Sequence, residues 1–523
     1  MINGFKGQFA VCRTALAVLA AVAAILPAAA HARPDKPKSG ELWKYADPTK
    51  IETLDTAGGA FRLHFTRQGP DAVPAGDGNA DGFPDYVQEL GEMYEKVLTF
   101  YQKLGFAKPP SDEGAGGDGR FDVYLLDFAG KGDGNFVSES CLADVCSGYM
   151  VQENDFADYS YPSVDYANRI LSSHEFFHAV QAGYDAKQSS IISEGTAVWA
   201  TEQYDASLYD FENFIPGYLQ HPDRSLDKPM IGPVDGFSYG SALFFQFLGE
   251  RYGPQAILHL WQDCKNGARG IANPGWFEAL AALCEREFGS SFAEEFTTFA
   301  MWNLRTAVYA DPAVSYAKGA AYPKVASLAA KLPYRDDDLR VFYASSQYLR
   351  FAPEGRAEVA VVVAPKTDAS GLRLGMVARK GKQFGEWVWL SAPMQLPLWT
   401  VDTKGMDEVF VLVVNTAQGG ESARGSLCVG SPEEAAKCLP AAPQPDATSG
   451  NAAADGGGTS GDSAAGGQDA AAVADTAPVS KAEPDSGCTA ASASAGGRSA
   501  GAAWLAAAAA AVAWLRRRRS SAT

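Results

Sequence analysis

The spacing of apolar side chains changes along the chain and divides it into parts. Between residues 61 and 340, short apolar runs alternate with segments whose apolar residues recur every three to four positions, the period of a helix. One helix is predicted by five apolar residues at this spacing: Val87, Leu90, Met93, Tyr94 and Val97. A second is predicted to start at Ser163 or Asp165, after Pro162, and to stop at Gly183. This mixture predicts an α+β domain.

Residues 341–430 have a different pattern, in which short apolar stretches are separated by Gly, Pro and Asp. This spacing is typical of successive strands, so we expect a small all-β sandwich domain over residues 341–440. The expected strands are Val341–Phe351, Val359–Ala364, Leu372–Ala378, Trp387–Leu390, Leu396–Val401 and Glu408–Val414. The segment offers no candidate chemistry, and its role in substrate binding, in folding or as a stalk stays open.

Residues 1–32 have the organisation of a secretion signal peptide. Basic residues precede the apolar run 14–29, which is short for a membrane span. Ala30-His31-Ala32 fits the small-x-small cleavage rule, so Arg33 is expected to begin the mature chain. The alternative is an uncleaved N-terminal anchor. Residues 33–60 are then an extended lead-in to the first domain.

The C-terminal end also differs from a folded domain. Residues 441–487 are mostly Ala, Gly, Ser, Asp and Pro, which predicts a disordered acidic linker. Cys488, an apolar run from Ala500 to Leu515 and the arginines 516–519 follow. This order of parts resembles the C-terminal sorting tag of myxobacterial surface proteins. The resemblance implies that residues 488–523 are a sorting or anchor segment, held in the membrane until processing near Cys488; the alternative is a plain tail anchor.

Export also affects how the cysteines are interpreted. In an oxidising compartment, the simplest pairing by local spacing gives three disulfides: Cys141–Cys146, Cys264–Cys284 and Cys428–Cys438. None of these pairs has the C-x-x-C spacing of a structural zinc site. We therefore do not interpret the cysteines as metal ligands.

The formal net charge of −18 argues against nucleic acid as a partner, because phosphate binding needs a basic surface. It suits a protein that binds calcium, and one acidic segment resembles the start of a calcium loop. The loop positions 1, 3, 5, 7 and 9 are occupied by Asp77, Asn79, Asp81, Phe83 and Asp85, and Phe83 would bind through its backbone carbonyl. Position 12 is Gln88, so the bidentate glutamate is missing. The alternative is an Asx-rich turn without metal.

The clearest chemical motif lies in the second predicted helix. The chain has only six histidines, yet two of them frame His174-Glu175-Phe176-Phe177-His178. Residues at i and i+4 share one helix face, so both imidazoles can bind one zinc ion. Glu175 lies beside them, next to the coordination position that a catalytic zinc leaves open. The motif therefore predicts His174 and His178 as zinc ligands and Glu175 as the general base of a hydrolytic reaction.

A third ligand is expected downstream, on a helix that Ser190 or Ser193 could cap. Glu194 is the candidate, at the start of Glu194-Gly195-Thr196-Ala197-Val198-Trp199. Asp185 is the alternative, although it is close to the end of the first helix. Glu202 is expected to lie further from the metal.

Residues 174–178 and 194–199 together resemble the gluzincin clan of zinc metallopeptidases. The string Glu-Gly-x-Ala-x-aromatic is similar to the corresponding string of the aminopeptidase-N-like branch. Over about residues 60–350 the chain most resembles exported myxobacterial metalloproteases. The resemblance implies a zincin-like catalytic domain at residues 61–340 that hydrolyses peptide bonds. It also implies that Tyr239 donates to the oxyanion, with ordinary core packing as the alternative. The interval between His178 and Glu194 is shorter than in well-known gluzincins, and position 198 is not acidic.

These patterns predict an exported zinc endopeptidase for protein or peptide substrates, at the cell surface (outer membrane) or released. An aminopeptidase is disfavoured because the Gly-x-Met-Glu-Asn sequence of such enzymes is absent. An alternative from another class is a non-catalytic surface adhesion protein with structural zinc. Glu175 argues against it, since a structural site has no use for a general base. The oligomeric state stays open.

Overall fold

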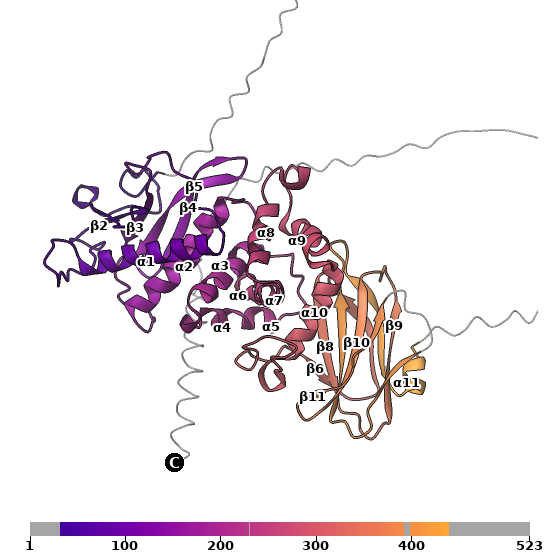
Figure 1. Ribbon diagram of the computed structural model, residues 1–523. Helices are drawn as coiled ribbons and strands as arrows, with labels where there is room; N and C mark the ends of the chain where they lie inside the picture. The colour runs from indigo at the N-terminus through magenta and orange to yellow at the C-terminus, as the bar shows by residue number, and fades with distance from the viewer. Residues whose placement is uncertain (1–31, 230, 392–397, 439–523) are drawn as a thin grey trace, which may run out of the picture.

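The computed structural model describes residues 32–229, 231–391 and 398–438. It is a mixed α/β structure, with an N-terminal region of helices and one sheet and a C-terminal region of two sheets (Figure 1). The signal peptide up to residue 31, the linker 441–487 and the segment 488–523 lie outside the described residues. Within the described part of the chain, no helix has the length and apolar character needed to cross a membrane.

The N-terminal sheet has five strands in the order β1-β2-β3-β5-β4. They are β1 (Glu52–Asp55), β2 (Phe61–Phe65), β3 (Phe121–Leu126), β4 (Gly134–Leu142) and β5 (Val145–Glu153). The three central strands are parallel, and the edge strands β1 and β4 are antiparallel to their neighbours. Side chains alternate across the sheet: in β3, Val123 and Leu125 join the core beneath the helices, while Tyr124 and Leu126 face the other side.

The lead-in covers this second face of the sheet. Trp43 and Tyr45 pack in the small apolar cluster of Tyr124, and the Tyr45 hydroxyl donates to the His64 carbonyl oxygen at 2.6 Å. Arg33 anchors the start of the segment, where its buried guanidinium pairs with three acidic side chains: Asp112, Asp122 and Glu139. The lead-in is therefore part of the folded region.

Helices α1 (Asp85–Lys103) and α2 (Val164–Ala182) form where the apolar spacing predicts them. Ser163 caps α2 by accepting a hydrogen bond from the Tyr166 amide, and Gly183 follows its last residue. Helix α3 (Ser190–Tyr204) begins one residue earlier than expected, because Ser189 rather than Ser190 or Ser193 is its N-cap.

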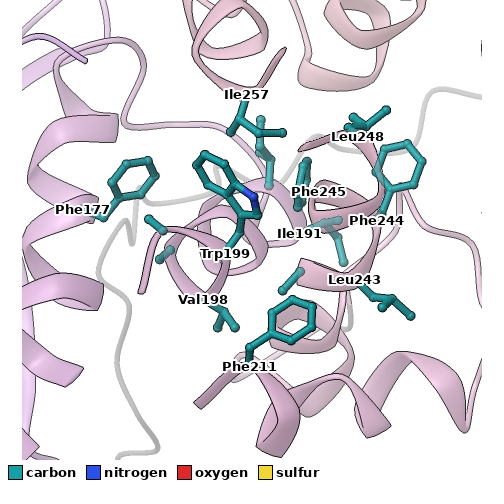
Figure 2. Packing of buried hydrophobic residues seen from close by; sticks show 14 of the residues in the cluster. Phe177, Ile191, Val198, Trp199, Phe211, Leu243, Phe244, Phe245, Leu248 and Ile257 are labelled. Carbon is teal, nitrogen blue, oxygen red and sulfur yellow. The ribbon is translucent and has the colours of Figure 1, made fainter. Parts of the chain in front are cut away.

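The core of the helical region forms around α3. Trp199 packs between Phe177 of α2 and a group of side chains from later helices, among them Phe245 and Ile257, while Val198 lies beside Phe211 (Figure 2). Gly195 allows α7 (Ala242–Tyr252) and the residue before it to approach closely, since a Cβ there would lie 2.2 Å from Ser241 Oγ. The remaining helices are α4 (Asp210–Phe214), α5 (Pro216–Leu219), α6 (Gly236–Gly240), α8 (Gln255–Asp263), α9 (Trp276–Leu283) and α10 (Phe292–Leu304).

The C-terminal region contains a six-stranded and a four-stranded sheet that enclose an apolar core. The larger sheet has the order β11-β10-β14-β8-β6, with β12 also paired to β10; the smaller has the order β13-β9-β15-β7. The strands are β6 (Leu328–Ala330), β7 (Tyr334–Val341), β8 (Ser345–Phe351), β9 (Glu358–Pro365), β10 (Leu372–Lys380), β11 (Gln383–Phe384), β12 (Val388–Ser391), β13 (Trp399–Asp402), β14 (Glu408–Asn415) and β15 (Ala423–Gly430). A short helix, α11 (Pro432–Ala436), follows.

Two expectations about these strands need correction. The expected strand Val341–Phe351 is the end of β7, a turn with Ala344 at φ 48°, and β8, which belong to different sheets. The pairing also begins at Leu328, upstream of residue 341. The outer face of the larger sheet carries Phe410 into the helical core, and the Tyr348 hydroxyl donates to the Ala300 carbonyl of α10 at 2.9 Å. The sheets are thus joined to the helices by a shared core.

Two of the three expected disulfides form, Cys141–Cys146 and Cys428–Cys438. The expected Cys264–Cys284 bond does not, and both residues are buried free thiols. Each sulfur packs in the apolar core of the helical region, and burial raises the pKa of the Cys284 thiol to about 12. A neutral buried thiol packs as a small apolar group, so these cysteines do not require a partner.

Candidate metal centre

Helices α2 and α3 pack against each other and bring three buried residues together. His174 Nε2 lies 3.3 Å from Glu194 Oε2, and His178 Nε2 lies 3.5 Å from the same oxygen. One ligand atom from each residue lies within 4.8 Å of the others, so the group could hold a metal ion. Among the described residues, no other group of three or more His, Cys, Asp or Glu side chains converges in this way.

The turn between the two helices positions Glu194 and excludes Asp185 from the group. Asp185 Oδ1 accepts a hydrogen bond from the Lys187 amide at 2.8 Å, and its Oδ2 accepts one from Gln188 Nε2 at 2.8 Å. Asp185 therefore stabilises the turn after α2. Glu202, two turns beyond Glu194, is ion-paired with Lys318 at 2.5 Å and lies outside the group.

The buried amide of Gln181 determines which nitrogen His178 presents to the centre. Gln181 Nε2 donates to the Ser193 carbonyl oxygen at 2.8 Å, and that oxygen can only accept. Its Oε1 therefore faces His178 Nδ1, at 2.8 Å, and can only accept from it. His178 consequently carries its proton on Nδ1 when neutral, which leaves the Nε2 lone pair free for a metal.

Mutual attraction dominates the charges of the three residues. Burial alone would raise the pKa of Glu194, but His178 and His174 hold it well below the usual range. Burial would likewise lower the pKa of His178, yet Glu194 raises it to about 9. The pKa of His174 is raised in the same way. The Glu194 carboxylate and the two imidazoles thus favour each other's charged forms.

Glu175 lies at the edge of the centre and differs from its neighbours. It is partly exposed, whereas His174, His178 and Glu194 are buried. The low-dielectric surroundings raise its pKa, against the effect of the two histidines. A glutamate with a raised pKa beside a metal group is suited both to accept and to return a proton.

Tyr239, the expected oxyanion donor, lies beside the centre on α6. The centroid of its ring is 6.0 Å from that of His174, and the ring stacks on Phe214 of α4 with centroids 4.7 Å apart. Tyr239 is partly buried and also contacts the main core. The position is compatible with both the catalytic and the packing interpretation, and the role of Tyr239 stays a prediction.

The structure adds acidic residues that the motif analysis missed. Asp133 immediately precedes β4, and a Cβ on the following Gly134 would lie 3.2 Å from Glu175 Cγ. The Tyr161 hydroxyl donates to Asp133 Oδ2. Asp210, the first residue of α4, is buried and interacts electrostatically with His174 and Asp133. No local sequence pattern connects these positions to the histidines, because the fold alone brings them together.

The expected calcium loop is an exposed turn held by its own side chains. Asp77 accepts from the amides of Asp81 and Gly82 at 3.2 and 3.0 Å, and Asp85 accepts from the amide of Gly78 at 2.8 Å. The Asn79 side-chain oxygen accepts a hydrogen bond from the Asp81 amide at 3.0 Å. The backbone amide of Phe83, whose carbonyl is the expected ligand, donates to the Asp81 carboxylate. These bonds form an Asx-turn network. Calcium binding stays a prediction.

Comparisons with known proteins do not indicate a family. No protein-family model and no curated protein match the chain. Among solved structures, the chain has a similarity to one described as "A novel family GH115 4-O-Methyl-alpha-glucuronidase, BtGH115A, with specificity for decorated arabinogalactans", with 10% identity and a TM-score of 0.14. The match covers 62% of this chain and 53% of the glucuronidase chain, so this chain spans about half of the length of the glucuronidase. A TM-score this low carries no argument about fold or function.

Proposed function

We propose that this chain is an exported, zinc-dependent peptidase whose catalytic region is zincin-like. The observation that carries the proposal is the buried group of His174, His178 and Glu194, with the partly exposed Glu175 between the two histidines on α2. Two imidazoles and one carboxylate are a known donor set for catalytic zinc. The fixed tautomer of His178 supports this fit, since its Nε2 is left free to bind.

In the proposed reaction, zinc and the protein side chains have separate roles. Zinc bound by the three residues would supply Lewis acidity, which lowers the pKa of a coordinated water to about 7 and polarises the scissile carbonyl. Glu175 accepts the proton of the attacking water and returns it to the leaving amine. Tyr239, beside His174, donates its hydroxyl to the oxyanion. Gln181 keeps the imidazole of His178 in place.

The surroundings of Glu175 support an extended peptide as substrate. Strand β4 is an edge strand of the N-terminal sheet, and Gly134 at its start lies against Glu175. An edge strand offers unpaired backbone groups to which an extended chain can add as a further strand. The two disulfides fit an oxidising, exported location, at the cell surface or in the medium.

Substitution of Glu175 by Gln tests the proposal. We expect the purified protein to bind one equivalent of zinc and to cleave casein, and Glu175→Gln to keep its zinc while losing roughly 100-fold or more in rate. Glu89→Gln is the matched control, because Glu89 is an exposed glutamate on α1. Zinc is measured by mass spectrometry and cleavage by release of labelled peptides.

The outcome also separates the alternative, a surface adhesion protein with structural zinc. That alternative predicts a zinc-loaded protein that cleaves nothing, and whose folding is lost on chelation. In that case Glu175→Gln would change no measured property. The proposed peptidase activity would then be refuted.

A further inference from the structure

Asp210 is a buried acidic residue that forms no ion pair with a lysine or arginine among the described residues. The residue is 7% exposed, and its Oδ2 has no hydrogen-bond partner among the described residues. Buried carboxylates are normally paired or hydrogen-bonded, because an isolated buried charge is costly. An unpaired carboxylate in a folded protein therefore needs an explanation.

Helix α4, which begins with Asp210, packs beside the metal centre. Asp210 and Phe214 are at i and i+4 and so share one face of this short helix. Phe214 stacks on Tyr239, whose ring lies beside that of His174. The same face of α4 therefore carries Asp210 and the contact to the centre. The electrostatic interaction of Asp210 with His174 agrees with this placement.

Asp133, the residue before the edge strand β4, supplies a second negative charge. It is partly exposed, its carboxylate accepts from the Tyr161 hydroxyl, and it precedes the glycine that lies against Glu175. Asp133 and Asp210 also interact electrostatically with each other. Two carboxylates thus lie close to His174 and Glu175 of the metal centre.

Two basic side chains of the helical region are paired with other carboxylates. Lys318 pairs with Glu202, and Arg169 pairs with Asp165 and Asp205. If zinc is bound, the charges of Glu194 and Glu175 together balance its two positive charges. The carboxylates of Asp133 and Asp210 then stay uncompensated, and a cation entering from solvent would be stabilised.

We infer that Asp133 and Asp210 form an anionic subsite that selects substrates with a positive charge beside the scissile bond. This inference rests on the proposed peptidase function and specifies its substrate class. The shared chemistry is an ammonium or guanidinium group, supplied by a lysine or arginine side chain or by a free N-terminal amine. Asp133 is the partly exposed contact, and Asp210 strengthens the field from behind it.

Binding of non-cleavable peptides tests the subsite independently of turnover. The probes are phosphinic peptides that differ only in lysine or norleucine beside the phosphinate, each with a free and an acetylated N-terminus. Calorimetry on the zinc-loaded protein should give at least about tenfold tighter binding of the lysine or free-amine peptide. Asp133→Asn and Asp210→Asn should each reduce this ratio several-fold. Asp338→Asn, an exposed aspartate on β7, is the control and should leave it unchanged.

The arms of the experiment assign each result. If tight binding is lost when the N-terminus is acetylated, the recognised cation is the substrate amine. If tight binding is lost only when lysine is replaced by norleucine, the recognised cation is the side chain. Thermal melting and zinc content show whether each variant is folded and loaded. Equal binding of charged and neutral peptides by the wild-type protein, or an unchanged ratio in both aspartate variants, would overturn the subsite. Selective binding without cleavage of matched ordinary peptides would overturn the peptidase function and leave the cation subsite in place.

Discussion

Gln181 connects the fold to the proposed metal chemistry, and Gln181→Leu should weaken zinc binding. Its amide accepts from His178 Nδ1 at 2.8 Å and donates to the Ser193 carbonyl and to Thr196 Oγ1 at 2.8 and 2.9 Å. Leucine has a similar volume and none of these bonds. His178 would then lose the contact that fixes its tautomer and orientation.

The expected loss of zinc affinity is separate from the loss of folding stability, and the two are measured independently. Removing a hydrogen-bond partner of a metal-binding histidine costs about 10- to 100-fold in metal affinity. The polar groups left unpaired in the core cost about 1–3 kcal/mol of folding stability as well. Zinc affinity is measured by competition with a chelator of known affinity, and stability by urea unfolding of the metal-free protein.

Gln188→Leu is the matched control, because Gln188 makes a comparable set of bonds away from the ligands. Its amide group donates to Asp185 and to the Pro274 carbonyl and accepts from the Trp276 amide, at 2.8, 2.9 and 2.9 Å. Both variants should lose folding stability, but only Gln181→Leu should lose zinc affinity beyond that loss. Equal zinc affinities in the two variants would refute the orienting role of Gln181.

Two further predictions concern charge. Because Glu194 raises the pKa of His178 to about 9 against the effect of burial, the metal-free protein holds a proton there at neutral pH that zinc must displace. Apparent zinc affinity should therefore rise by about tenfold per pH unit through neutral pH and level off above the pKa of His178; a flat profile in chelator competition would contradict this. Arg33→Met leaves Asp112, Asp122 and Glu139 without their buried cation and should cost about 3–5 kcal/mol in urea unfolding. Arg67→Met, which removes an exposed pair with Glu52, should cost less than about 1 kcal/mol, and equal losses would show that Arg33 does not anchor the lead-in.

Features that depend on local sequence could be predicted, and features that depend on tertiary packing could not. Helix α2 follows from its cap, its apolar period and Gly183, so the positions of His174 and His178 on one face follow too. Glu194 required a choice against Asp185, which only the hydrogen bonds of the turn resolve. The expected disulfide Cys264–Cys284 rested on sequence distance alone, which does not show that both thiols pack separately in the core.

Residues 341–351 show how a correct strand periodicity can still predict one strand where the structure has two. Apolar residues continue at strand spacing through Val341–Phe351, but Ala344 adopts a left-handed conformation and the chain passes from one sheet to the other. Val341 at the end of β7 and Phe351 at the end of β8 are buried in the same core between the sheets. The pattern of apolar residues therefore does not break at the turn. Periodicity records which side chains are buried, and it cannot show which strand they pair with.

The same distinction separates the proposed reaction from the proposed selectivity. The ligands and Glu175 lie within two adjacent helices, so a motif can represent them. The charges that would select a substrate come from the start of β4 and from α4, which meet at the centre only after the sheet and the helices have packed. The net charge of −18 acts over the whole surface and attracts any cation, but salt screens it beyond about 8 Å. A preference for one charged position beside the scissile bond therefore requires carboxylates held at that position, which is the role proposed for Asp133 and Asp210.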